Sequence, residues 1–451
     1  MLRHSLVAHC RLDDIVAFRK GEPITVRRFL EDVYRLVARL PAGQSVLNAC
    51  TDRYRFATGL AAAMVAGNAS LLPANLTAGT IARLREWKPD LICLTDGDCP
   101  DIKLPQIRFC DTDGPPVSMG DVAIPEFPAD QPVAWLFTSG STGEPVPHLK
   151  TWGSLVRNVG IEADRLGLNY GRRQVIVATV PPQHSYGLES SVLVALQSGV
   201  AFSAARPFYP VDICAALAEA PPPRVLVSTP FHLRLLVESG TAIPEIDLVV
   251  SATAPLSSAL VRQIEDRCAA PLLEIYGSTD TGQIASRRPS VAPDWELFTD
   301  IRLVPEEDGT WASGGHVGQP IMLHDVVELT GPDRFVLLGR SADLVNIVGK
   351  RSSLAFLTHQ LTTIPGVLDG TYFMPDEADA RGVTRLAALV VAPTLTSVEL
   401  NRALRARIDP AFLPRPLVFV DSLPRDATGK MPRDALRNMI DARDKAASEH
   451  R

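Results

Sequence analysis

The sequence lacks paired cysteines, a basic excess and any long apolar run, and each absence excludes a class of protein. Its seven cysteines are scattered and odd in number, without a Cys-x-x-Cys pair, so we expect neither a disulfide framework nor a zinc site. The net charge of −6 gives no basis for nucleic-acid binding, which depends on clustered basic residues. No run approaches the roughly 18–20 apolar residues of a membrane span. The N-terminal stretch shows no secretory signal, so we expect reduced thiols and a cytoplasmic location.

What is present indicates a globular α/β protein with more than one core. The chain has 451 residues, of which 46% are apolar and 21% charged. Apolar β-branched runs alternate with helix-like segments, a pattern typical of βαβ units and a parallel sheet. Strands are predicted at 175–180, 224–228, 248–251 and 272–276, and helices at 211–219 and 257–268, the second capped by Ser257 or Ser258.

The pattern changes near residue 340, where a second, smaller α+β domain is predicted to begin. A strand at 335–340 ends at Gly339-Arg340, and further strands are predicted at 387–392 and 417–420. A helix at 396–408 has Thr396 or Ser397 as a candidate cap, with Glu399 close behind. We therefore place the domain boundary between residues 1–340 and 341–451.

The stretch FTSGSTGEP at 137–145 follows an apolar run, and beyond Phe137 it consists mainly of small residues with little side chain to pack. One interpretation is a flexible Ser/Gly turn. The other is an anion site, because glycines let the backbone bend and hydroxyls add donors to the backbone N–H groups. The loop lacks the Gly-Lys-Ser/Thr ending of a Walker A motif. Its candidate phosphate-binding residues are Thr138, Ser139, Gly140, Ser141, Thr142 and Gly143.

Further segments in order give the chain a resemblance to the adenylate-forming superfamily of acyl- and aryl-CoA synthetases, peptide-synthetase adenylation domains and luciferase. FTSGSTGEP resembles the phosphate loop of that family. PPQHSYG at 181–187 is similar to its His-x-x-Gly segment, SATAPLS at 251–257 to its adenine-side strand and turn, and YGSTDTG at 276–282 to its Tyr-Gly-x-Thr-Glu segment. Asp325 stands fifteen residues before Arg340, as the ribose-binding aspartate does in the family. GRSADLVNIVGKR at 339–351 and LPRDATGK at 423–430 resemble the hinge and the C-terminal lysine segment.

The resemblance implies a large N-terminal adenylation domain with parallel-rich sheets and flanking helices, and a small, mobile C-terminal lid. It implies ATP and Mg²⁺, with Lys430 bridging the substrate carboxylate and the α-phosphate, Thr279 bonding that phosphate and Asp280 holding the metal. His184 would border the acyl pocket. The nucleotide would be contacted by Ser251, Ala252, Tyr276, Gly277, Ser278, Thr279, Asp325 and Arg340. Structural alternatives stay open. Tyr276 could be a core residue, and His184 could be bonded to backbone. Asp325 could be an exposed loop residue, Arg340 could pair with an acidic neighbour, and Lys430 could be a solvated surface residue.

The chain departs from the family pattern at four positions. Asp280 stands where the family usually has Glu, which makes the acid one methylene shorter. Val146 replaces the lysine after the phosphate loop, and Lys150 is a candidate to take its place. Ala342 and Asn346 replace hinge residues. These changes concern hinge behaviour and pyrophosphate binding, and they leave open a non-catalytic relative that binds AMP or an acyl group.

The substrate is expected to be an acid without an α-amino group, since Glu189 is the only acid near the His-x-x-Gly segment. The closest similarity is to stand-alone aryl acid ligases of aryl-polyene and xanthomonadin-type pigment pathways, which implies a hydroxybenzoate-like acid and an acyl carrier protein. Coenzyme A is the alternative acceptor. Arg402, Arg405 and Arg407 suit either, or form a solvated face. A fatty acyl-CoA synthetase, an acyl-amide ligase and an oxidoreductase on the same scaffold stay as alternatives.

Overall fold

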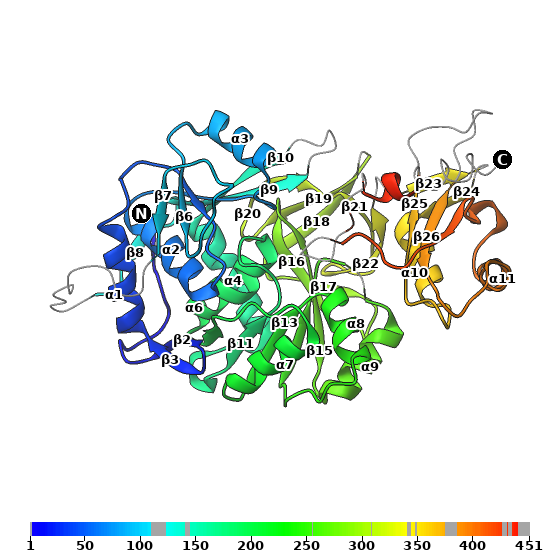
Figure 1. Cartoon of the computed structure of the whole chain (residues 1–451), viewed down its shortest axis with the longest axis horizontal. Helices are drawn as coiled ribbons and strands as arrows, with labels where there is room; N and C mark the ends of the chain where they lie inside the picture. The colour runs from blue at the N-terminus through cyan, green and yellow to red at the C-terminus, as the bar shows by residue number, and fades with distance from the viewer. Residues whose placement is uncertain are drawn as a thin grey trace. The chain divides into compact units, whose positions relative to one another are not determined.

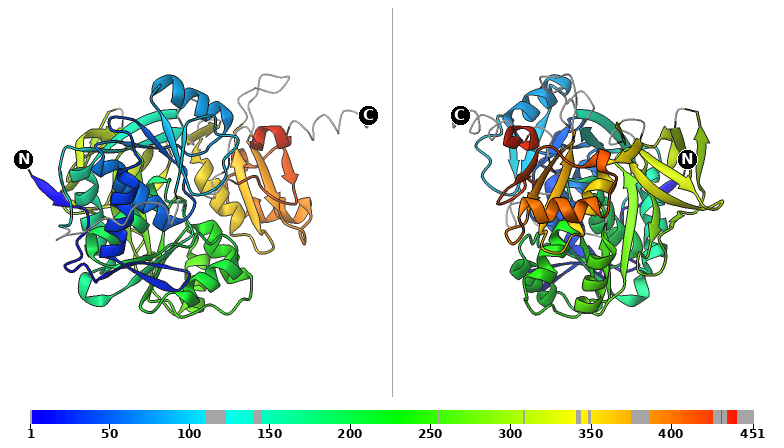
Figure 2. Two further views of the ribbon diagram at one scale, coloured as in Figure 1. Left: turned by 60° about the vertical axis from the view of Figure 1, so that its left-hand side comes forward. Right: turned by 90° about the vertical axis from the view of Figure 1, so that its right-hand side faces the viewer.

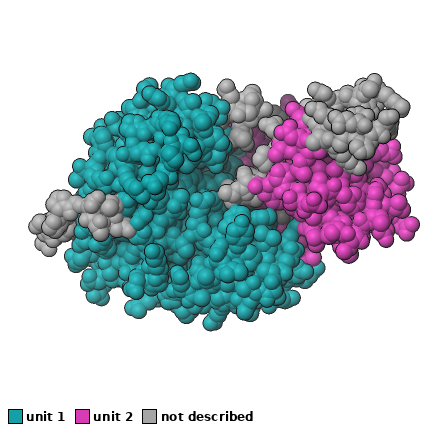
Figure 3. All heavy atoms as spheres, in the orientation of Figure 1, with its two compact units in different colours: residues 1–253, 262–303, 312–321 teal, residues 254–261, 304–311, 322–451 magenta. Residues whose placement is uncertain are grey.

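The computed structural model (Figure 1) describes residues 2–109, 123–139, 145–254, 256–307, 309–340, 344–347, 350–374, 386–425, 431 and 435–440. The chain forms two compact units (Figure 3). Unit 1 comprises 1–253, 262–303 and 312–321, and unit 2 comprises 254–261, 304–311 and 322–451. The domain boundary predicted after residue 340 stays a prediction, because unit 2 as it packs also takes in the segment 322–340.

The first large sheet of unit 1 has the strand order β10-β9-β5-β4-β6-β7. All neighbours are parallel except β9 and β10, which form an antiparallel hairpin around the phosphate-loop segment. None of these strands was predicted, and β4 to β7 have only three or four residues each, which is too few to show periodicity. Their bounds are β4 (Val46–Asn48), β5 (Ser70–Leu72), β6 (Ile92–Thr95), β7 (Gln106–Arg108), β9 (Pro132–Ser139) and β10 (Pro145–Thr151).

The second sheet of unit 1 has six adjacent parallel strands with antiparallel strands at either side, in the order β17-β16-β15-β14-β13-β11-β12-β2-β3. The predicted strands at 224–228 and 248–251 are confirmed, and the strand at 272–276 extends to Ser278. The bounds are β2 (Ile15–Arg19), β3 (Glu22–Thr25), β11 (Val175–Ala178), β12 (Ala201–Ser203), β13 (Arg224–Ser228), β14 (Leu248–Ser251), β15 (Leu272–Ser278), β16 (Gly282–Arg287) and β17 (Trp295–Leu297).

Helices connect the parallel strands, and their ends follow local capping rules. Ser257 accepts a hydrogen bond from the Leu260 N–H at 3.2 Å, so the predicted cap of the 257–268 helix is confirmed. The bounds are α1 (Val26–Val37), α2 (Arg53–Val65), α3 (Ala78–Trp87), α4 (Trp152–Leu166), η1 (Tyr170–Arg172), α5 (Ser185–Gly187), α6 (Val194–Ser198), α7 (Pro210–Glu219), α8 (Pro230–Glu238) and α9 (Ser258–Cys268). Between α5 and α6, the segment η2 (Leu188–Leu193) is a π-helix.

Two small sheets complete the strand inventory outside the C-terminal part. One pairs β1 (Arg3–Ser5) with β8 (Glu126–Pro128). The other has the order β18-β19-β20, with bounds β18 (Ile301–Glu306), β19 (Gly309–Gly314) and β20 (Val317–Met322). Among the described residues, no helix is long and apolar enough to cross a membrane.

Unit 2 contains two hairpins and the small α+β fold that the sequence predicted, visible in orange and red in Figure 2. Thr396 and Glu399 form a capping box at the start of α11, which confirms the predicted cap. The hairpins are β21 (Asp325–Leu329) with β22 (Arg334–Arg340), and β23 (Leu344–Ile347) with β24 (Lys350–Ser353). The remaining elements are α10 (Leu354–Thr362), β25 (Asp369–Phe373), β26 (Ala387–Val391), α11 (Ser397–Arg405), η4 (Pro410–Phe412) and β27 (Leu417–Phe419).

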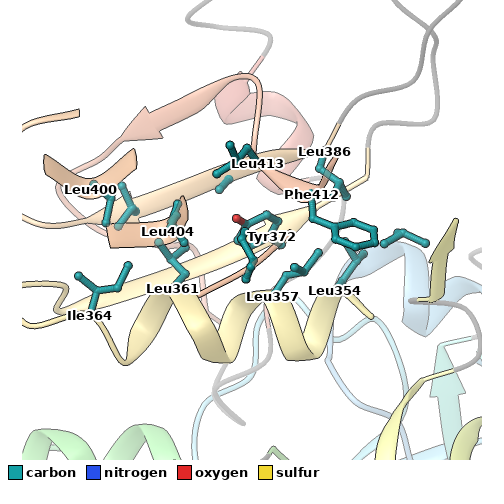
Figure 4. Packing of buried hydrophobic residues seen from close by; sticks show 14 of the residues in the cluster. Leu354, Leu357, Leu361, Ile364, Tyr372, Leu386, Leu400, Leu404, Phe412 and Leu413 are labelled. Carbon is teal, nitrogen blue, oxygen red and sulfur yellow. The ribbon is translucent and has the colours of Figure 1, made fainter. Parts of the chain in front are cut away.

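Strand alternation divides the core of this fold between the two faces of the β25-β26-β27 sheet. Ala388 and Val390 join the cluster built by α10 and α11, where Leu357 and Leu404 are fully buried beside Tyr372 (Figure 4). Their neighbours Ala387 and Leu389 belong to a second cluster with Val418, Leu423, Leu436 and Ile440. The sheet is therefore covered on both faces, as an independent core requires.

Candidate active site

The β9–β10 hairpin of unit 1 meets the turn between β15 and β16, which lies far from it in sequence. His148 Nε2 lies 3.0 Å from Thr138 Oγ1 and 3.0 Å from Asp280 Oδ1. Lys150 Nζ donates a hydrogen bond to the Asp280 carbonyl oxygen at 3.2 Å. Two predicted site residues, Thr138 and Asp280, thus share His148 as a contact, and Lys150 adds a second contact from β10 to Asp280.

The predicted phosphate loop leaves β9 at this point. Ser139 is the last residue of β9 and pairs with Pro145, the first residue of β10. Because β9 and β10 are hydrogen-bonded neighbours, both ends of the loop are held beside Thr138. The predicted residues Gly140, Ser141, Thr142 and Gly143 lie outside the described residues.

The turn that carries Thr279 and Asp280 is fixed by its own hydrogen bonds. Ser278 N–H donates to Thr281 Oγ1 and Thr281 N–H donates to Ser278 Oγ, each at 3.2 Å. A Cβ on Gly277 would collide with the backbone of Gly282, so only glycine fits there. Thr279 and Asp280 are half-buried at the tip. These contacts fix the backbone that carries the Thr279 and Asp280 side chains.

Tyr276 is buried at the end of β15, and its ring packs against Trp295 with the centroids 5.5 Å apart. The structure therefore gives Tyr276 the core contact that the sequence left open. Ser251 ends the neighbouring strand β14 and is fully buried, and Ala252 follows it half-buried. Thr253 has a φ of 81°, a left-handed conformation that a β-branched residue rarely adopts.

His184 caps the short helix α5, as its Nδ1 accepts a hydrogen bond from the Tyr186 N–H at 3.3 Å. In the neutral ring this bond leaves the proton on Nε2. Gly187 closes the segment, where a Cβ would collide with the Pro181 carbonyl. The backbone-bonded alternative for His184 is thus present, and it fixes the ring orientation.

In unit 2, Asp325 and Arg340 are direct cross-strand partners at the open end of the β21–β22 hairpin. The fifteen-residue spacing is therefore the spacing of a hairpin register. Lys430 and Ala342 lie outside the described residues.

Sequence reasoning missed a buried polar cluster behind the Asp280 turn. Glu162 on α4 and Glu189 on η2 are both fully buried. Burial raises the pKa of Glu162 to about 8, the charge of Glu189 adds to this effect, and Ser190 and Gln283 oppose it. Burial also lowers the pKa of His316 to about 4, and the charge of Lys150 acts in the same direction. Glu162 lies in a helix, so the sequence signal for this cluster would have been a charged residue on the apolar face of a predicted helix.

Lys150 is the cation of this cluster, with 9% of its surface exposed. Burial lowers its pKa, and the charges of Glu189 and Asp280 raise it. Glu189 in turn accepts a hydrogen bond from Ser185 Oγ at 3.1 Å. Lys150 therefore lies between the His-x-x-Gly segment and the Asp280 turn.

Few protein side chains in the site could bind a metal ion. Among the described residues, no three or more His, Cys, Asp and Glu side chains gather as a metal-binding group. Asp280 supplies carboxylate oxygen, the donor that Mg²⁺ prefers, and Mg²⁺ bound with a nucleotide often uses one or two carboxylates plus phosphate oxygens. The residues therefore fit a magnesium–nucleotide complex better than a resident metal.

A match to a family model decides the assignment: residues 16–335 match the model described as AMP-binding enzyme. The chain belongs to this family. A 4-coumarate–CoA ligase of Rhodobacter capsulatus is 30% identical over 299 residues, 65% of this chain and 73% of the relative. A 3-hydroxybenzoate–CoA/4-hydroxybenzoate–CoA ligase of Thauera aromatica is 24% identical over 355 residues, 69% of this chain and 67% of the relative. The AMP-binding chain is accordingly an enzyme of the acid–thiol ligase class.

Solved structures agree with the AMP-binding fold. ATP-bound MatB from Rhodopseudomonas palustris superposes with a TM-score of 0.82 at 19% identity, covering 95% of this chain and 96% of the other. The o-succinylbenzoate coenzyme A synthetase MenE of Bacillus subtilis, in complex with ATP and magnesium ion, gives a TM-score of 0.83 at 16% identity, covering 97% and 100%. The predicted α/β fold class is confirmed.

Proposed function

We propose that this enzyme uses ATP to activate a hydroxybenzoate-like aryl acid as an acyl adenylate and then transfers the acyl group to a thiol. The observation that carries the proposal is the meeting of Thr138 with Asp280 through β10, at the root of the predicted phosphate loop. The names of the CoA-ligase relatives, which include coumarate and hydroxybenzoates, support an aryl acid. The proposal includes a cytoplasmic location, which the free thiols among the described cysteines support.

The chemistry explains why such a site is needed. A carboxylate is a poor acyl donor, since its charge repels nucleophiles and oxide is a poor leaving group. In the first step, a carboxylate oxygen attacks the α-phosphorus of ATP, the bond to the β-phosphate breaks and pyrophosphate leaves. In the second step, a thiolate attacks the acyl carbon and AMP leaves with the bridging oxygen. Two anions meet in the first step, so donors and cations must surround them.

Residues of the phosphate loop and the turn take the nucleotide side. Thr138, Ser139 and the segment 140–143 would bind the phosphates, and Thr279 would donate to the α-phosphate. Mg²⁺ held by Asp280 would neutralise phosphate charge when bound. Ser251, Ala252, Tyr276, Gly277 and Ser278 would line the adenine side. Asp325 would accept hydrogen bonds from the ribose hydroxyls, with Arg340 beside it.

The remaining candidate residues would bind the acid substrate and the thiol acceptor. His184, whose Nδ1 is already bonded, would border the acyl pocket through its Nε2 edge. Residues 341–451 would act as a mobile lid that brings Lys430 to the two anions. The acceptor is the phosphopantetheine thiol of an acyl carrier protein, as in pigment-pathway ligases, or coenzyme A. Arg402 and Arg405 lie in the last turn of α11 and would suit either acidic partner.

Exchange of labelled pyrophosphate into ATP tests the proposal. The panel contains 3- and 4-hydroxybenzoate, 4-coumarate, a medium-chain fatty acid and malonate. We expect exchange with one or more hydroxyaryl acids, and product mass with CoA, holo carrier protein or an amine then identifies the acceptor. Exchange with no acid would refute adenylation, and exchange with the fatty acid alone would favour a fatty acyl-CoA synthetase.

Lys430→Ala tests the role proposed for this lysine in the same exchange assay. One charge pair near 4 Å at an effective dielectric constant of 20 contributes roughly 4 kcal/mol, which is on the order of a thousandfold in rate. We expect that loss in exchange while ATP still binds in a calorimetric titration. A variant that exchanges pyrophosphate at a near-normal rate would remove Lys430 from the mechanism.

A further inference from the structure

Strand β10 presents two basic residues, His148 and Lys150, that the family resemblance does not assign a role. They stand two residues apart, and alternate residues of a strand lie on one face. Leu149 between them is exposed. Both reach the same residue, Asp280, which is 130 positions from Lys150 along the chain.

Lys150 holds the main chain of the turn. Its Nζ donates to the Asp280 carbonyl oxygen at 3.2 Å, and the side chain is almost completely buried. Burying an ammonium group costs free energy unless it is paired and hydrogen-bonded. Here the carbonyl supplies the hydrogen bond and Glu189 supplies opposite charge. A buried lysine held in this way is poorly placed to reach pyrophosphate, the role considered for it from sequence.

His148 contacts the side chain of the same residue. Its Nε2 lies 3.0 Å from Asp280 Oδ1 and 3.0 Å from Thr138 Oγ1. Since Asp is one methylene shorter than the Glu of the family pattern, the direction of this carboxylate decides whether it reaches a metal.

We propose that His148 and Lys150 are positioning residues that fix the Asp280 turn from one face of β10 and direct its carboxylate towards Mg²⁺ bound with ATP. This inference rests on the proposed function, because it assumes that the site takes a magnesium–nucleotide complex. Lys150 acts on the backbone and His148 on the carboxylate, so removal of either leaves Asp280 intact but misdirected. Partners of a metal ligand typically affect metal affinity roughly 10–100-fold.

The test compares Lys150→Met and His148→Leu with the full-length wild-type enzyme, and Leu149→Ala on the opposite face of β10 is the control. Mn²⁺ replaces Mg²⁺ as a paramagnetic probe, and its binding in the presence of ATP is followed by electron paramagnetic resonance. Calorimetry measures the affinity for ATP in EDTA. We expect both variants to bind Mn²⁺ with ATP about tenfold more weakly, with metal-free ATP affinity unchanged. His148→Gln, which retains an N–H donor, is expected to recover part of the loss.

Two results would overturn the inference. In the first, Lys150→Met weakens ATP binding equally with and without metal, which would make Lys150 a phosphate ligand. In the second, both variants bind Mn²⁺ with unchanged affinity, which would leave Lys150 and His148 without a positioning role. Circular dichroism of each variant verifies that the fold is retained. Because metal and ATP binding are measured without an acid, the test stands apart from the exchange panel, whose failure would instead refute adenylation.

Discussion

Glu162, a carboxylate of the buried cluster, has a pKa far above its ordinary value. Its side chain is fully buried on α4, and neither carboxylate oxygen has a well-formed hydrogen bond within the described structure. With burial raising its pKa to about 8, Glu162 keeps a proton at neutral pH in the folded chain. The unfolded chain, with the ordinary pKa of 4.5, releases that proton much earlier.

This difference in pKa predicts that the stability of the folded state depends on pH. Between pH 4.5 and about 8 the folded state binds more protons than the unfolded state, so stability falls as pH rises. Glu162→Gln removes the titration, and its stability relative to wild type should rise by up to about 1.4 kcal/mol per pH unit in this window. Urea unfolding across the pH range measures the effect, with the exposed Glu86→Gln as control. A pH-independent difference would contradict the assignment.

At the residue scale, the sequence predicted side chains that carry local signals and missed those that depend on distant contacts. Asp325 and Arg340 were predicted from their spacing, and the hairpin register explains that spacing. Lys150 was raised only as a substitute for a missing lysine. Its actual partner, Asp280, lies in a turn between two strands of a different sheet, and no periodicity links residues so far apart.

Among the elements, helix α2 is tied to strand β11 and to the π-helical segment η2 by one buried side chain. Arg53 Nη2 donates to the carbonyls of Ala178 and Val180 at 2.8 and 2.9 Å, and its Nη1 donates to Ser191 Oγ at 2.6 Å. The guanidinium is fully buried, and burial lowers its pKa to about 9. These contacts fix the helix that follows the His-x-x-Gly segment.

Arg53→Met should therefore weaken the fold more than the loss of one surface charge. The substitution leaves two buried carbonyls without their donor, and each unsatisfied buried group costs about 1–3 kcal/mol. We expect a loss of about 3 kcal/mol in the free energy of unfolding. Arg85→Met on the exposed face of α3 should change it by less than about 0.5 kcal/mol. Equal effects of the two variants in denaturant titrations would show that the tie is not stabilising.

Elements with strong local patterns were predicted well. The strands at 224–228 and 248–251 contain continuous apolar runs rich in valine, and the helix at 257–268 starts at a serine cap. The first sheet was missed because β4 and β5 have three residues each. The π-helical segment was also missed, since its polar residues Glu189 to Ser191 do not resemble a buried helix.

For the whole molecule, the predicted site residues divide between the two units. Thr138, His184, Ser251, Tyr276 and Asp280 belong to unit 1, whereas Asp325 and Arg340 belong to unit 2. The order of the motifs along 451 residues made the family recognisable, although no single motif was sufficient.

The central claim is that a carboxylate oxygen becomes bonded to AMP, and isotope transfer tests it most directly. An acid that supports exchange is prepared with ¹⁸O in both carboxylate positions and incubated with ATP, Mg²⁺ and a thiol acceptor. The account predicts that mass spectrometry finds one labelled oxygen in the AMP product and none in pyrophosphate. Unlabelled AMP, or label in inorganic phosphate, would contradict activation through an acyl adenylate.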